Sequence, residues 1–83
     1  MPTFLDRHDR FETSPEKEAA IADQIRSGRP TEDGVRGVNM FLTADGGAYC
    51  LMEAPDAAAV VRAHEGGGQT IRLEDVVEVR TLV

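Results

Sequence analysis

The stretch VRGVNMFLTADGGAYCLMEA, residues 35–54, decides the fold because it reads as two strands joined by a tight turn. Residues 35–43 are rich in β-branched and large apolar side chains, and Gly37 among them indicates a weakened strand or a bulge. Residues 44–47 contain Asp-Gly, which supplies the positive φ angles that hairpin turns need. Residues 48–54 form the returning strand. The rest of the chain is arranged around this hairpin.

The remaining elements follow from caps and periodicity. Residues 3–8 alternate in polarity and predict a first strand. Ser14 and Pro15 are typical of a helix start, and the glycine at 28 is typical of a helix end, so a helix is expected between them. A second helix is expected over 57–65 and a last strand over 74–82.

The order β-α-β-β-α-β is typical of an α+β sandwich of the ferredoxin-like type. With 83 residues, the chain is expected to form a single domain over residues 1–83. The first and third strands are expected to lie side by side and parallel, with both helices on one face of the sheet. Because a chain of this length builds only a thin core, a second copy is expected to cover the other face. The expected assembly is a homodimer of the dimeric α+β barrel type.

Charge and composition exclude several classes of partner. Lys and Arg number 9 against 15 Asp and Glu, for a net charge of -6, so neither nucleic acid nor an anionic membrane is an expected partner. No apolar run is long enough for a membrane span and no signal peptide is recognisable, which predicts a cytoplasmic protein. The single cysteine excludes an intrachain disulfide.

The candidate ligands for a metal ion are few. Asp6 and His8 lie two residues apart on the first strand and therefore on one face. Glu53 ends the third strand, and His64 ends the second helix. Imidazole nitrogen, carboxylate oxygen and thiolate sulfur together suit borderline divalent metals such as nickel, zinc, cobalt or copper. If the first and third strands are parallel, His8 and Glu53 lie at the same edge and form the start of a site.

Each candidate also has a purely structural explanation. His8 can be a solvated residue at a strand end, and Glu53 can be a carboxylate that favours a helix N-terminus. His64 can be a cation at a helix C-terminus. Cys50 has the opposite strand parity to Glu53 and is interpreted as a small buried residue.

Helix length argues against including His64 in the same cluster. At about 1.5 Å per residue, the helix carries His64 about 12 Å away from the end of the third strand. On this reasoning, His8 and Glu53 form the cluster, and His64 belongs to a second site, to a site shared with a partner, or to none.

Four segments resemble a known family: FLDRH (4–8), AYCLMEAP (48–55), AVVRAHE (59–65) and EDVVEV (74–79). The resemblance is to the small nickel-binding, ferredoxin-like family often catalogued as a domain of unknown function. It implies a dimer and, in the metal-binding branch, bound Ni(II). Carried over to this chain, it points to Asp6, His8, Glu53, His64 and Glu65. Where metal-binding members have a second histidine after the helix, this chain has Gln69, and an amide is a poorer nickel ligand.

Three functions follow as hypotheses. The first is a cytoplasmic protein that binds nickel or another divalent transition metal through His8, Glu53, Asp6 and His64, without catalytic residues. The second is a dimeric α+β barrel enzyme that acts on a small apolar substrate. The third is an interaction domain with a vestigial metal site, which the Gln69 difference keeps open.

Overall fold

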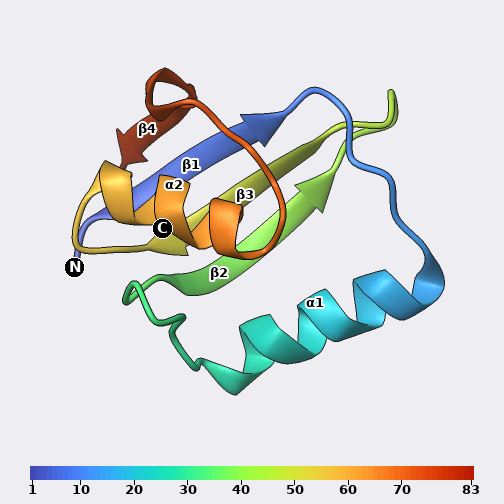
Figure 1. Ribbon diagram of the computed structural model, residues 1–83, viewed down its shortest axis with the longest axis horizontal. Helices are drawn as coiled ribbons and strands as arrows, with labels where there is room; N and C mark the ends of the chain where they lie inside the picture. The colour runs from blue at the N-terminus through green and yellow to red at the C-terminus, as the bar shows by residue number, and fades with distance from the viewer.

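The computed structural model describes residues 1–83 and has the expected β-α-β-β-α-β order (Figure 1). The fold is therefore the ferredoxin-like α+β fold that the sequence predicted. A short 3-10 turn, Leu73–Asp75, precedes the last strand, which covers Val76–Val79 instead of the expected 74–82. The elements are β1 (Thr3–His8), α1 (Pro15–Ser27), β2 (Arg36–Leu42), β3 (Ala48–Glu53), α2 (Ala57–Gly66) and β4 (Val76–Val79).

The four strands form one sheet in the order β2-β3-β1-β4, and every neighbouring pair is antiparallel. The expectation that β1 and β3 are parallel is wrong. In the register of this pair, Thr3 lies opposite Glu53 and His8 lies opposite Ala48. The C-terminal end of β1 therefore lies beside the N-terminal end of β3. This single reversal decides which side chains can share a site.

Gly37 marks a β-bulge, as its position in the second strand suggested. The register of β2 against β3 shifts between Gly37 and Asn39, and regular pairing then continues with Met40 opposite Cys50. A Cβ atom at position 37 would lie 3.1 Å from Cγ1 of Ile25, so the glycine also allows α1 to approach the sheet. The bulge sets which side chains of β2 face the helices.

Both helices begin at side-chain caps, of which the one at Ser14 was predicted from the sequence. The Ser14 hydroxyl accepts a hydrogen bond from the Lys17 amide at 3.2 Å, and the Asp56 carboxylate accepts one from the Ala59 amide at 2.8 Å. Gly28 ends α1 in the left-handed conformation, with φ of 69°. The helices differ in how they pack: α2 buries Ala59 and Val60, whereas α1 buries no residue and lies mainly along β2.

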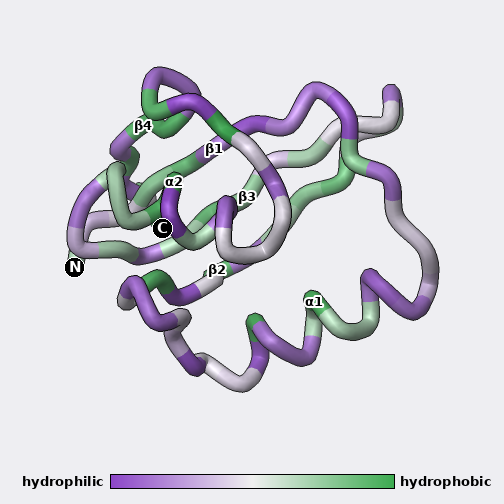
Figure 2. Tube along the Cα trace, viewed as in Figure 1, coloured by the Kyte–Doolittle hydropathy of each residue, from purple (hydrophilic) through white to green (hydrophobic).

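The hydrophobic core lies between α2 and the inner face of the sheet. Figure 2 shows apolar segments running along the central strands beneath α2. Asp6 is the only fully buried charged residue of the chain, at 1% exposure. The core consists of Phe4, Val35, Met52, Ala54, Ala59, Val60 and Ile71.

The outer face of the sheet carries no helix. The pairing puts Leu5, Leu51 and Val77 in one row across β1, β3 and β4, and Phe41 beside Tyr49 in the next row. Phe41 and Val77 are 48% and 56% exposed. Separately, neither helix has the length and apolar character that crossing a membrane would require.

Candidate metal centre

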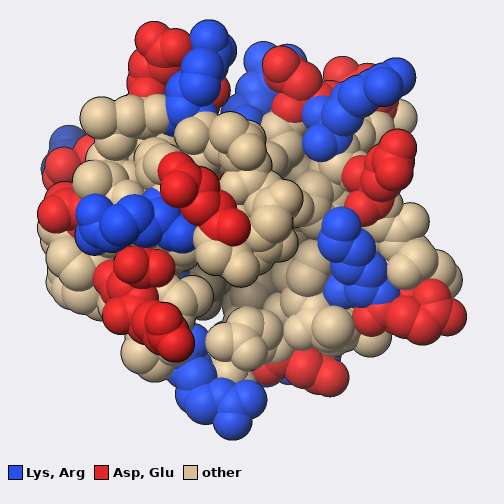
Figure 3. All heavy atoms as spheres, viewed as in Figure 1, with Lys and Arg blue, Asp and Glu red and all other residues tan.

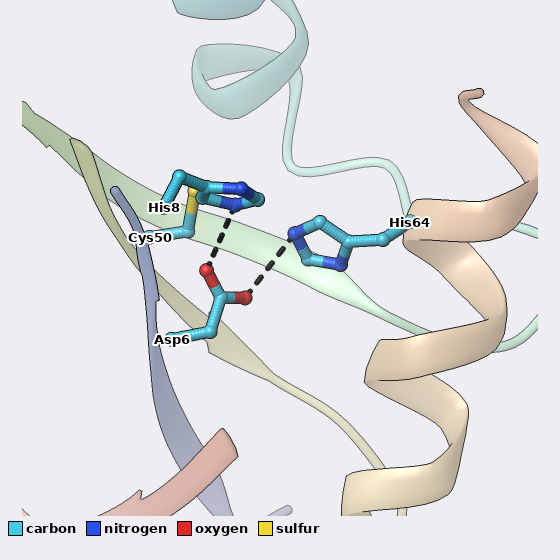
Figure 4. Close-up of side chains that lie close together, drawn as sticks. All are labelled: Asp6, His8, Cys50 and His64. Carbon is cyan, nitrogen blue, oxygen red and sulfur yellow. Dashed lines mark ion pairs between the residues drawn. The ribbon is translucent and has the colours of Figure 1, made fainter. Parts of the chain in front are cut away.

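Four side chains with metal-ligand atoms meet on the inner face, near the chain end of β1 (Figure 4). One ligand atom from each lies within 4.8 Å of all the others. Asp6 and His8 come from β1, Cys50 comes from β3, and His64 comes from the last turn of α2. We call this set the four-residue cluster: Asp6, His8, Cys50 and His64.

The sheet register brings the first three together. Asp6 and His8 are two residues apart and point to the same face, and Asp6 lies directly opposite Cys50. Cys50 and Glu53 point to opposite faces of β3, and Cys50 therefore shares the face of Asp6. Cys50, expected to be a small buried residue, is thus a member of the cluster. The alternation of side chains along the strand shows that Cys50 and Glu53 lie on different faces, but only the register of β1 against β3 identifies Asp6 as the neighbour of Cys50.

His64 reaches the cluster because β3 runs in the opposite direction to the one expected beside β1. Helix α2 turns back from the end of β3 and so travels toward the chain end of β1. The length of α2, which was expected to carry His64 away from His8, instead brings the two residues together. Their ring centroids lie 5.2 Å apart. The expectation that His64 cannot meet His8 within one chain is wrong.

Glu53 lies away from the cluster, at the other end of the sheet. It faces Thr3 across the β1–β3 pair, and its carboxylate accepts a hydrogen bond from Nε of Arg36 at 2.9 Å. The expectation that His8 and Glu53 share one edge fails for the same reason as the parallel pairing. Glu65 is exposed beside His64 and is not a member of the cluster.

Asp6 is the centre of the cluster. Its Oδ1 lies 3.1 Å from Nε2 of His8, and its Oδ2 lies 3.2 Å from Nε2 of His64 (dashed lines in Figure 4). Although these distances are short, both oxygens and Nε2 of His8 are buried without a hydrogen bond of acceptable geometry. Buried polar atoms normally find a partner, so three convergent atoms without one indicate a place for a ligand.

His64 is held in a defined orientation. Its Nδ1 lies 2.8 Å from the carbonyl oxygen of Val60, and because a carbonyl only accepts, Nδ1 must donate. In the neutral ring, Nε2 then presents a lone pair toward Asp6. A lone pair facing a carboxylate is repulsive unless a proton or a metal ion lies between them. Donation from the second nitrogen to a backbone carbonyl is common in metal-bound histidines.

The Cys50 thiol is kept neutral in the absence of a metal. Burial and the negative charge of Asp6 raise the pKa of Cys50 to about 12. At neutral pH the thiol is therefore a poor nucleophile. A bound cation would reverse this balance by favouring the thiolate.

The hairpin turn supports the end of β1. The backbone oxygen of Gly46 accepts a hydrogen bond from the Phe11 amide at 2.8 Å. A Cβ atom at Gly47 would lie 2.7 Å from the carbonyl oxygen of His8. The strand that carries His8 thus rests directly on the glycine of the turn.

The fold and the cluster together define a small ferredoxin-like protein with a candidate transition-metal centre. Two imidazoles, a carboxylate and a thiol fit borderline transition metals better than Mg²⁺ or Ca²⁺, which prefer oxygen ligands alone. The chain belongs to the SCO4226-like family, described as nickel responsive protein SCO4226-like, whose model matches residues 4–79. Comparisons with curated proteins and with solved structures give no match.

Proposed function

We propose that this protein binds one Ni(II) ion, or a similar divalent transition metal, in the four-residue cluster. The observation that carries the proposal is the pair of unsatisfied Asp6 oxygens, each facing an imidazole nitrogen. Because the bond to Val60 directs the Nε2 lone pair of His64 toward Asp6, a cation between Nε2 and Oδ2 would turn this repulsive contact into two ligand bonds. The family description gives nickel as the first ion to test.

The residues have separate tasks in this proposal. Asp6 supplies negative charge at the centre, and His8 and His64 supply neutral nitrogen donors from two different elements. The Val60 carbonyl fixes the ring of His64 so that Nε2 faces inward. Cys50 is the fourth donor, and its proton leaves when a metal binds. No residue is assigned a catalytic role.

Titration calorimetry with Ni(II), on protein purified without a histidine tag, tests the proposal. We expect one ion per chain, and His64→Ala lowers the affinity at least about 100-fold. Glu53→Gln is the matched control because Glu53 lies at the far end of the sheet, and its affinity should stay within about twofold of the parent. Absence of binding for Ni(II), Co(II) and Zn(II) would overturn the proposal, as would equal losses in both variants.

We further propose that the protein is a homodimer whose subunits meet through the outer sheet face. The support is the continuous apolar row across three strands, together with the exposed Phe41 and Val77. Exposed apolar area of this kind usually marks an interaction surface. Light scattering should give twice the 9.0 kDa mass of one chain. Phe41→Glu should dissociate the dimer, whereas Leu73→Glu, outside this face, should not.

A further inference from the structure

Cys50 has a second potential ligand on the side away from Asp6. Strand β3 lies between β1 and β2, and the register places Asp6, Cys50 and Met40 at the same level on these three strands. Directly opposed residues in an antiparallel pair point to the same face, with Cβ atoms about 5 Å apart. Cys50 therefore has Asp6, with its oxygen donors, beside it on β1 and Met40, with its thioether, beside it on β2.

Met40 and His64 line the same cavity as Cys50. This cavity, of about 400 Å³, lies between α1, the inner face of the sheet and α2. Apolar side chains including Ile25 and Val35 form part of its wall. In Figure 3, a hollow bordered by uncharged atoms is visible between the regions of α1 and α2. Met40 is half-buried there, so its side chain is neither locked in the core nor fully solvated.

We infer that this side of the cluster binds a soft monovalent ion, Cu(I), through Met40 Sδ, Cys50 Sγ and His64 Nε2. Thiolate and thioether ligands select Cu(I), whereas the Asp6 and His8 side suits borderline divalent ions. When a monovalent cation replaces the thiol proton, the total charge of the site does not change, which limits the cost of placing the ion beside apolar walls. When Cu(I) binds, the Cys50 proton passes to solvent, and no electron is transferred.

The inference rests on the proposed metal cluster because it shares Cys50 and His64 with it. Met40 is the residue whose replacement should distinguish Cu(I) binding from Ni(II) binding, because a thioether is a poor ligand for Ni(II). Flexible methionine side chains adapt readily to a site of this kind. The cluster would then have one face for each class of ion and would hold one ion at a time.

Competition with bicinchoninate under anaerobic conditions, with ascorbate to keep copper reduced, tests the inference. The parent protein should withdraw one equivalent of Cu(I) from the coloured complex. Met40→Leu, which nearly conserves volume, should weaken Cu(I) binding by about tenfold or more and leave the Ni(II) affinity unchanged within about twofold. Cys50→Ala should abolish transfer of Cu(I).

Met52→Leu is the matched control. Met52 is a second methionine that lines the same cavity, but it lies two residues from Cys50 along β3, opposite Phe4 and Gly37 instead of at the level of Asp6. The Met52→Leu variant should bind Cu(I) with the affinity of the parent protein. Failure of the parent to take Cu(I), or equal Cu(I) affinity in Met40→Leu and the parent, would overturn the inference. If Ni(II) still binds in that case, the proposed function stands; if neither ion binds, both fail.

Discussion

Asp6 is the residue on which the cluster depends, and it is in an unfavourable environment without a cation. It is buried at 1% exposure, beside two imidazoles and a thiol, and neither of its oxygens has a well-formed hydrogen bond. A buried carboxylate in this state costs free energy. Unfavourable groups that a fold retains are commonly found at functional sites. Binding and stability should therefore change in opposite directions when Asp6 is replaced.

Asp6→Asn tests this opposition. The amide can donate to Nε2 of His64, so we expect the metal-free variant to gain about 1 kcal/mol of unfolding free energy at pH 8.5. Its Ni(II) affinity should fall at least about 100-fold. Urea denaturation and calorimetry measure the two effects. Asp9→Asn, which removes an exposed partner of Arg7, should change neither; a loss of stability in Asp6→Asn would contradict the argument.

Cys50 predicts an alkaline limit of stability for the metal-free protein. Its pKa is about 12 in the folded state against 9.0 for the free group, so the folded state holds the proton more tightly. The stabilising contribution is complete below pH 9.0 and is lost as the pH rises toward 12. The folding equilibrium constant of the parent should fall by up to about tenfold per pH unit in this window.

Comparison of the parent with Cys50→Ala isolates that contribution, because other groups titrate equally in both proteins. Urea denaturation at a series of pH values from 8 to 11 measures it. The difference in unfolding free energy should shrink as the pH rises. Parallel curves over the whole range would contradict the assignment.

At the level of elements, the sequence determined local structure well and strand direction poorly. The cap at Ser14, the bulge at Gly37 and the hairpin turn are local features, and each was predictable from a few adjacent residues. Whether β1 and β3 are parallel depends on contacts between distant segments. The error in direction exchanged Glu53 for His64 in the expected cluster. Asp6 and His8 were unaffected because both lie on one strand.

The two helices differ in their attachment to the sheet, and mutations should reveal it. Val60 in α2 is 0% exposed, whereas Ile25 in α1 is only half-buried and lies beside the cavity. We expect Val60→Ala to cost about 2 kcal/mol or more and Ile25→Ala about 1 kcal/mol. Urea denaturation measures both. Amide hydrogen exchange should be faster in α1 than in α2; equal protection of the two helices would contradict this expectation.

The whole molecule should respond to its ion because the donors come from opposite ends of the chain. Asp6 and His8 lie in the first strand and His64 in the second helix, so a bound ion would connect segments that are far apart in sequence. In a small domain with a thin core, such a connection is a large fraction of the total stability. Binding to the folded state alone raises stability in proportion to the logarithm of the ion concentration.

Ni(II) at about 100 times its dissociation constant should therefore raise the melting temperature by about 10 °C or more. Differential scanning calorimetry measures the shift. Glu53→Gln should show the same shift as the parent, whereas His64→Ala should show almost none. A shift that persists in His64→Ala would mean that the stabilising ion binds elsewhere.

The close approach of Gly47 to the end of β1 has a consequence for how related chains are read. Residue 47 supplies no ligand to the cluster, yet any side chain there would collide with the carbonyl of His8. The backbone of His8 would have to shift, and its imidazole would move with it. A related chain could retain Asp6, His8, Cys50 and His64 and still lose the geometry of the cluster through one substitution in this turn, which is distant from His8 only in the sequence. An inventory of ligands would count that chain as competent, whereas inspection of its hairpin would not.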